Sequence, residues 1–187
     1  HLVSVLNTLD RSIAAGWSGK VKRLHCQGAL SSKTAKLDVL AELCTKIEEV
    51  GLIDCGLNAT DIALLSAVSG NCCVLRHLNL SGNRFGPSGL QPLVQQLRQC
   101  SNLSSLNLRK TMISDGLEHL RHILIECKVL QHLDLSENSI SGLHFHPLSD
   151  AFCECKCLTF LDLTGNRLSI VGAQLLASVV WRCEALE

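Results

Sequence analysis

The sequence predicts an α/β fold built as a solenoid, in which short strand–loop–helix units stack side by side. Two observations predict it. Nearly the same line of leucines recurs at intervals of 27 or 28 residues, and the second half of each line carries apolar residues at helical spacing. One unit of this length cannot bury its apolar face alone, so neighbouring units are expected to share one core along the 187 residues.

The repeat starts are set by the first leucine of each line. They fall near residues 21, 47, 75, 103, 130, 158 and 186, and we predict a single domain over residues 1–187 that is a fragment of a longer protein. The pattern is LxxLxLxxN, in which x is any residue. Three lines match it fully: Leu75-Leu78-Leu80-Asn83, Leu130-Leu133-Leu135-Asn138 and Leu158-Leu161-Leu163-Asn166. Three others carry a different residue at the asparagine position: Ala29, Cys55 and Thr111.

The LxxLxL half of each line is expected to be a strand whose leucines face the core. Alternate residues of a strand point to opposite faces, so the residues between the leucines define a second surface, the concave face. Its predicted members are Arg23, His25, Gln27, Glu49, Gly51, Ile53, His77, Asn79, Ser81, Ser105, Asn107, Arg109, His132, Asp134, Ser136, Phe160, Asp162 and Thr164. Only Ile53 and Phe160 are large and apolar, which is typical of a sheet face left open to solvent.

The second half of each line is expected to be a helix. Leu90, Leu93, Val94 and Leu97 recur at spacings of three and four residues. Later units repeat the spacing with Leu117, Leu120, Leu124, Leu175, Leu176 and Val179. We expect Gly89, Gly116 and Gly172 just before these helices, at the turn out of the strand and loop. The 27-residue line lacks one residue between Ile113 and Gly116, where an irregular turn is expected to absorb the deletion.

These lines resemble leucine-rich repeats of the ribonuclease-inhibitor type, which also form the sensing region of NOD-like receptors. The resemblance covers residues 21–187, and residues 1–15 look like the helix of a preceding unit. It implies a right-handed βα horseshoe. Strands about 4.8 Å apart and helices about 8–10 Å apart bend such a stack, with the strands on the inside.

Composition argues against several kinds of partner. The chain has 17 basic and 17 acidic residues and only 3% aromatic residues, so we expect no binding to nucleic acid. It contains no run of 18 apolar residues, so we expect no membrane span. Two of its three glycosylation sequons, at Asn79 and Asn102, lie in the leucine lines, where Asn-Leu-Ser arises readily, and we expect a cytoplasmic location. Phosphate-loop, dinucleotide, HExxH and GxSxG motifs are absent from the sequence. We therefore expect no enzymatic activity and no cofactor.

Eleven cysteines invite a disulfide or metal interpretation. Six lie three residues before the next line: Cys44, Cys72, Cys100, Cys127, Cys155 and Cys183. We expect this column to be reduced thiols packed in the core at the helix ends. The alternative is zinc bound by the segment HFHPLSDAFCECKC, whose side chains are His144, His146, Cys153, Cys155 and Cys157. The helix would separate its histidines from its cysteines by about 10–15 Å, which favours the first interpretation.

We predict that a protein partner binds the concave face. The predicted contact residues, which come from adjacent strands, are Phe160, Asp134, Asp162, Glu137, His132, Arg109 and His77. Phe160 is either an exposed interface anchor or a side chain covered by another segment. Asp134 and Asp162 are either solvated carboxylates or a pair awaiting a basic side chain from a partner, and a catalytic pair is the least favoured alternative.

The resemblance implies the ligand-sensing or autoinhibitory region of a NOD-like innate immune receptor. Two alternatives stay open: a constitutive cytoskeletal or ciliary scaffold, and a regulator or inhibitor of an enzyme such as a ribonuclease or a GTPase. Neither end shows a polar capping unit, so self-association through the truncated repeat ends is also expected.

Overall fold

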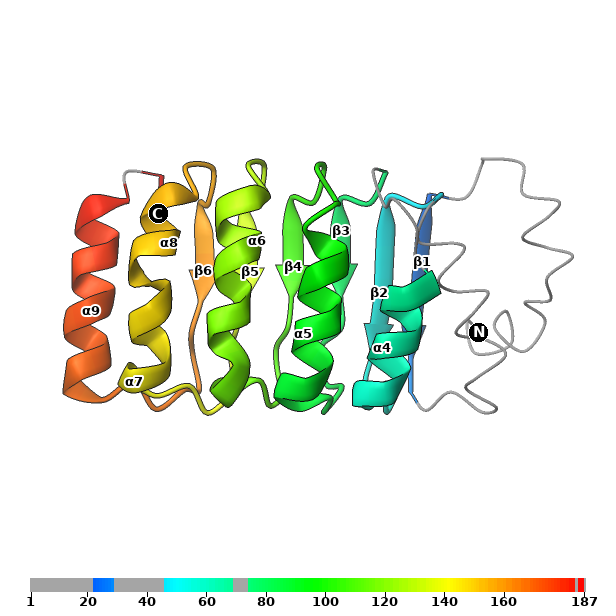
Figure 1. The fold of residues 1–187 in the computed structure, drawn as a ribbon, viewed down its shortest axis with the longest axis horizontal. Helices are drawn as coiled ribbons and strands as arrows, with labels where there is room; N and C mark the ends of the chain where they lie inside the picture. The colour runs from blue at the N-terminus through cyan, green and yellow to red at the C-terminus, as the bar shows by residue number, and fades with distance from the viewer. Residues whose placement is uncertain (1–21, 29–45, 69–73, 184, 187) are drawn as a thin grey trace, which may run out of the picture.

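The computed structural model describes residues 22–28, 46–68, 74–183 and 185–186, which form a parallel sheet backed by a layer of helices (Figure 1). Six strands lie in these ranges, side by side in chain order. They are β1 (Arg23–Gln27), β2 (Glu49–Ile53), β3 (His77–Asn79), β4 (Ser105–Asn107), β5 (His132–Asp134) and β6 (Phe160–Asp162). Each strand begins two residues after a repeat start read from the sequence.

The helices of the described ranges all follow a strand and pack on the same side of the sheet, in a row from β2 to the last unit (Figure 1). They are α4 (Ala59–Val68), α5 (Gly86–Leu97), η1 (Ser114–His119), α6 (Leu120–Glu126), α7 (Gly142–Phe145), η2 (His146–Leu148), α8 (Ser149–Glu154) and α9 (Ser169–Arg182). The predicted solenoid of strand–helix units is confirmed. No helix in the described part of the chain is long and apolar enough to cross a membrane.

The leucines of the repeated line fill the space between the sheet and the helices. Leu103, Leu106 and Leu108 are at most 1% exposed, and the equivalent residues of the neighbouring units are also buried. Leu161 and Leu163 are only half-buried, because β6 is the edge strand of the described sheet. The predicted helical core positions before residue 125 are all buried: Leu90, Leu93, Val94, Leu97, Leu117, Leu120 and Leu124.

The asparagine column joins each unit to the one before it. Asn138 is 1% exposed, and its Nδ2 donates to the carbonyl oxygens of Leu108 at 2.7 Å and Leu135 at 3.1 Å. Its Oδ1 accepts the backbone N–H of Thr111 at 2.9 Å. Where the asparagine is replaced, Thr111 donates its hydroxyl to Leu108 at 2.6 Å, and the thiol of Cys55 donates to a carbonyl oxygen at 3.5 Å. The looser lines therefore keep part of the same bonding.

The three glycines expected just before the helices lie inside them, and that prediction is wrong. Gly89 is within α5, Gly116 within η1 and Gly172 within α9. All three are buried. A Cβ at Gly89 would lie 2.8 Å from the Cβ of Phe85, and one at Gly172 would lie 3.0 Å from the Cα of Gly142. The glycines are needed for close packing of the first helical turn rather than for a turn of the chain.

The deleted residue of the 27-residue line is absorbed by a change of helix type. The segment after Ile113 begins with the 3₁₀ helix η1 and continues as α6. A 3₁₀ helix rises about 2.0 Å per residue and an α-helix about 1.5 Å, so fewer residues cover the same height. The deletion lies where it was predicted, but the segment is regular rather than an irregular turn.

Some predictions fall outside the described residues. They are the helix over residues 1–15, the repeat start at Val21, Ala29 at the asparagine position of the first line, and the column members Cys44 and Cys72.

Candidate functional site

The predicted concave face is the side of the sheet opposite the helices. Most of its side chains are half-buried or exposed, as expected, but Gly51 and Ser136 are buried. The parallel register aligns its residues in rows across the strands. One row runs through His77, Ser105, His132 and Phe160, so three predicted contact residues lie along it.

An aromatic pair lies on the last two strands of this row. His132 on β5 is opposite Phe160 on β6, with ring centroids 5.8 Å apart and ring planes tilted by 30°. Phe160 is 48% exposed, so the described residues leave about half of its surface open to solvent. Among the described residues of the concave face, Phe160 is the only large apolar one that is exposed. Ile53, the other large apolar residue of this face, is half-buried.

Asp134 and Asp162 lie opposite each other in the next row of the same strands. Each also closes a local turn. Oδ1 of Asp134 accepts the N–H of Ser136 at 2.9 Å, and Oδ1 of Asp162 accepts the N–H of Thr164 at 2.8 Å. On β3 and β4 the same turn is made by the neutral side chains of Asn79 and Asn107. The turn therefore does not explain the negative charges on β5 and β6.

Neither of these two carboxylates forms an ion pair with the described part of the chain. Among the described residues, no lysine, arginine or histidine nitrogen lies within 4.0 Å of Asp134 or Asp162. The third acidic residue of the concave face, Glu49, differs because it pairs with Arg23 at 3.1 Å and with His25 at 2.8 Å. Within the described ranges, the negative charge of the concave face is thus left uncompensated at β5 and β6 only.

The remaining predicted contact residues are not all gathered with this group. Arg109 and Glu137, just beyond the ends of β4 and β5, form an ion pair with each other, and Lys110 joins them at 3.1 Å from Glu137. The hydrogen bonds from Lys110 and Arg109 lower the pKa of the Glu137 carboxyl. His77 lies on β3, two strands away from His132. The structure therefore brings together His132, Asp134, Phe160 and Asp162, which we name the β5–β6 patch.

The concave face also has a hollow of about 250 Å³, and His77 is the only predicted contact residue among the residues that line it. Its polar lining residues are His25, Glu49, His77, Asn79, Ser105 and Asn107. No motif in the sequence indicated this hollow.

The cysteine column is buried where the structure describes it. Cys100, Cys127 and Cys155 are at most 3% exposed and Cys183 is 8% exposed, which agrees with the predicted core packing. Burial raises the pKa of Cys127 and of Cys155 to about 11. Within the described ranges, no three histidine, cysteine or acidic side chains lie together in a way that could hold a metal ion.

Comparisons with known proteins agree with this architecture. A family model described as leucine-rich repeat matches residues 71–94 and 154–177, and a second one matches residues 129–151. The chain is 32% identical over 123 residues to mouse "NACHT, LRR and PYD domains-containing protein 14", and 34% identical over 116 residues to mouse "NACHT, LRR and PYD domains-containing protein 4E". These matches cover 62% and 59% of this chain but only 12% of each relative.

Two solved structures share the fold at low sequence identity. "Leiomodin-1 Actin-Binding Site 2" matches with a TM-score of 0.65 and 16% identity, covering 82% of this chain and 90% of that one. The tropomodulin C-terminal domain of Caenorhabditis elegans matches with a TM-score of 0.56 and 12% identity, covering 97% and 92%. At such identities the likeness concerns the fold alone.

The stacked strand–helix units and the asparagine column define a leucine-rich-repeat solenoid. The chain is therefore a leucine-rich-repeat solenoid, and its sequence is similar to part of two mouse proteins whose names combine this repeat with NACHT and PYD domains.

Proposed function

We propose that this chain is a protein-recognition module and forms the ligand-sensing or autoinhibitory leucine-rich-repeat region of a cytoplasmic NOD-like innate immune receptor. The mouse relatives support the receptor, because their names combine this repeat with a NACHT and a PYD domain. The β5–β6 patch supports the recognition role. It is the one place on the described concave face where an exposed aromatic ring and uncompensated charge lie together.

The chemistry of the patch favours a partner that inserts an arginine. A guanidinium can stack on an aromatic face and donate to a carboxylate at the same time. Phe160 supplies the ring, and Asp162 lies two residues further along the same strand, on the same face. No hydrogen bond to Oδ2 of Asp162 occurs among the described residues, so this oxygen is available to an incoming donor. A lysine satisfies the charge but cannot stack or donate in a plane.

The binding test uses peptides, because it does not need the natural partner. The full chain is titrated with short unstructured peptides that carry arginine, lysine or the neutral isostere citrulline at one position. We expect binding in the order arginine, lysine, citrulline. Asp162→Asn should remove the preference for arginine, since the asparagine still closes the turn but carries no charge. Leu143→Ala is the matched control, because Leu143 is 82% exposed on α7, away from the strands. Equal binding of the three peptides would contradict the proposed partner chemistry.

The receptor assignment has a separate test. The transcript is sequenced upstream of the codon for His1. A nucleotide-binding domain in that region would support a receptor whose repeats sense a ligand. Further repeats without a nucleotide-binding domain would contradict it and favour a scaffold or an inhibitor.

Actin binding is the alternative that the comparisons raise, since the leiomodin-1 structure is described as an actin-binding site. The similarity covers most of both chains, but it concerns only the fold. Co-sedimentation of the full chain with actin filaments, together with a titration against labelled monomeric actin, decides between the two. Saturable binding of either form at micromolar concentration would favour the scaffold.

A further inference from the structure

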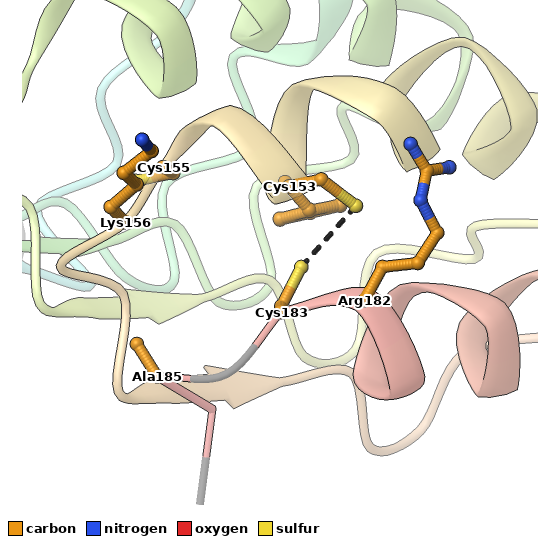
Figure 2. Close-up of a pocket in the computed structure, with 7 residues that line it drawn as sticks. Cys153, Cys155, Lys156, Arg182, Cys183 and Ala185 are labelled. Atoms are coloured by element: carbon orange, nitrogen blue, oxygen red, sulfur yellow. Dashed lines mark hydrogen bonds between the residues drawn. The ribbon is translucent and has the colours of Figure 1, made fainter.

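Two thiols from the last two units are in contact. Sγ of Cys153 in α8 and Sγ of Cys183, the residue after α9, are 3.4 Å apart, although the residues are 30 positions apart in the sequence. Figure 2 shows the two sulfur atoms pointing toward each other. A disulfide bond requires about 2.05 Å, so the sulfurs must approach by about 1.4 Å, which is within reach of side-chain rotation.

The other thiols of the column that the structure describes are arranged differently. The Sγ atoms of Cys100, Cys127 and Cys155 face the backbone carbonyl oxygens of Gln96, Leu97 and Leu130, at 3.6–3.9 Å. In these contacts a buried thiol, which is a weak donor, faces a carbonyl oxygen rather than a second sulfur. Cys183 occupies the same column, but its contact is the sulfur of Cys153.

The pair is also reachable from solvent. It borders an open cavity of about 500 Å³, which is lined by Lys156, Arg182, Phe152, Cys155 and Ala185 as well as the two thiols (Figure 2). Cys153 is half-buried, whereas Cys183 is 8% exposed. A small solute therefore reaches Cys153 first. The cavity carries two cationic side chains, and Arg182 is held there by Asp150, whose Oδ1 lies 3.0 Å from Nη1.

We propose that Cys153 and Cys183 form a redox modification site, which hydrogen peroxide converts from a dithiol to a disulfide that ties α8 to α9.

The reaction needs only the two thiols and one peroxide. The thiolate of Cys153 attacks one oxygen of the peroxide and the O–O bond breaks. The products are a sulfenic acid on Cys153 and, after the second oxygen takes up a proton, one water. The thiolate of Cys183 then attacks Sγ of Cys153 and expels the hydroxyl group as a second water. Two thiols and one hydrogen peroxide thus give one disulfide and two waters, and the sulfurs lose two electrons together.

The roles of the two cysteines follow from their surroundings. Cys153 is the more accessible of the two thiols, because it is half-buried and borders the open cavity, whereas Cys183 is 8% exposed. Burial, followed by the contact with Cys153, raises the pKa of Cys183 to about 12. Cys183 is therefore a poor first nucleophile and acts on a sulfenic acid already in contact with it. In a reducing compartment the resting state is the dithiol, and thiol reductants reverse the bond.

The test is peroxide titration of the fully reduced chain, followed by thiol blocking and digestion without reduction. We expect a peptide pair joined through Cys153 and Cys183, 2 Da lighter than the two free peptides, after about one equivalent of peroxide. Fragment spectra must separate Cys153 from Cys155, which lies two residues away. The cross-linked chain should melt at a higher temperature than the reduced chain, and dithiothreitol should reverse both changes.

Two variants complete the experiment. Cys157→Ser is the matched control, because Cys157 is the exposed cysteine of the same segment, and it should leave the cross-link unchanged. Cys153→Ser should abolish the cross-link and the rise in melting temperature. It is preferred to Cys183→Ser, which disturbs a buried position. The proposal would be overturned if peroxide oxidises Cys157 while Cys153 and Cys183 remain reduced and are then alkylated by the blocking reagent. Sulfinic acid on Cys153 without any cross-link would overturn it as well.

Discussion

Asn107 on β4 donates a hydrogen bond of 2.9 Å from Nδ2 to Oδ2 of Asp134 on β5. This bond makes the two facing carboxylates of the β5–β6 patch unequal. Both oxygens of Asp134 are engaged, because Oδ1 also accepts from the N–H and the hydroxyl of Ser136. Asp162 uses only Oδ1, for the turn at Thr164. Asp134 is therefore mainly a structural carboxylate, whereas Oδ2 of Asp162 accepts no hydrogen bond from the described residues.

The first prediction compares Asp134→Asn with Asp162→Asn. Asn107 cannot reorient, because its own Oδ1 accepts the N–H of Arg109. An amide at position 134 would turn its Oδ1 to Ser136 and its NH₂ group toward the NH₂ group of Asn107. We expect Asp134→Asn to lose about 1–2 kcal/mol of unfolding free energy. Asp162→Asn should lose less than about 0.5 kcal/mol, since asparagine makes the same turn on β3 and β4.

Urea unfolding of both variants at pH 7 measures the difference. The double substitution Asn107→Ala with Asp134→Asn is the check on the mechanism. It removes the clash between the two amides, so the effects of the two substitutions should be non-additive. Equal unfolding free energies of Asp134→Asn and Asp162→Asn would show that the hydrogen bond between Asn107 and Asp134 contributes nothing to stability.

The asparagine column gives a second prediction. Asn138→Ala leaves the carbonyl of Leu108 and the N–H of Thr111 without this buried partner. We expect a loss of about 2–4 kcal/mol, because several backbone groups lose a hydrogen bond at a site closed to water. Asn166→Ala is the comparison, since Asn166 makes the same bonds but is half-buried. Calorimetric unfolding of both variants should show the larger loss for Asn138→Ala, and the reverse order would contradict this account.

The leucine period carries most of what the sequence predicts about the fold. It sets the start of each strand, the face of each leucine and the column of buried asparagines, because a period-two strand leaves little freedom of register. It does not place the glycines. Whether Gly89 precedes a helix or lies in its first turn depends on its contact with Phe85, which is a property of packing between turns. The 3₁₀ form of η1 also follows from the height of the neighbouring helices rather than from local preference.

The candidate site could be predicted only as a surface. The alternation of residues places Phe160 and Asp162 on the concave face, and the exposed fraction of Phe160 agrees. Sequence alone could not show that Arg109 and Glu137 form an ion pair, because the two residues belong to different, neighbouring repeat units. The contact between Cys153 and Cys183 depends on side-chain directions at two helix ends, and nothing in the column pattern distinguishes it.

Phe160→Asp is the third prediction, and it separates binding from folding. Phe160 is 48% exposed, so we expect the melting temperature to change by only a few degrees while binding of arginine-containing peptides falls. Phe145→Ala is the contrasting variant, because Phe145 is fully buried and stacks on Phe152 with ring centroids 5.4 Å apart. It should lose about 3–5 kcal/mol. If Phe160→Asp unfolds the chain as Phe145→Ala does, Phe160 belongs to the core.

The fourth prediction concerns acid. Hydrogen bonds from Lys110 and Arg109 lower the pKa of Glu137 below its ordinary value of 4.5. A carboxyl group with a lowered folded pKa stabilises the fold above its unfolded pKa and loses that contribution as pH falls through the folded pKa. We therefore expect Glu137→Gln to reduce stability at pH 7 but to flatten the decline in melting temperature from about pH 4.5 downward. Parallel melting curves of the variant and the wild type from pH 7 to pH 3 would contradict this.

The last prediction concerns alkali and the buried thiols. Burial raises the pKa of Cys55 to about 12 and that of Cys127 to about 11, from an ordinary value of 9.0. Above pH 9 the unfolded chain releases these protons while the folded chain keeps them, so stability falls as pH rises toward the folded pKa. Each such thiol lowers the unfolding free energy by up to about 1.4 kcal/mol per pH unit in that window. Urea unfolding between pH 8 and pH 11 should show this slope, and Cys127→Ala should make it shallower. A slope that does not change in Cys127→Ala would mean that this thiol is ionised in the folded protein as readily as in the unfolded chain.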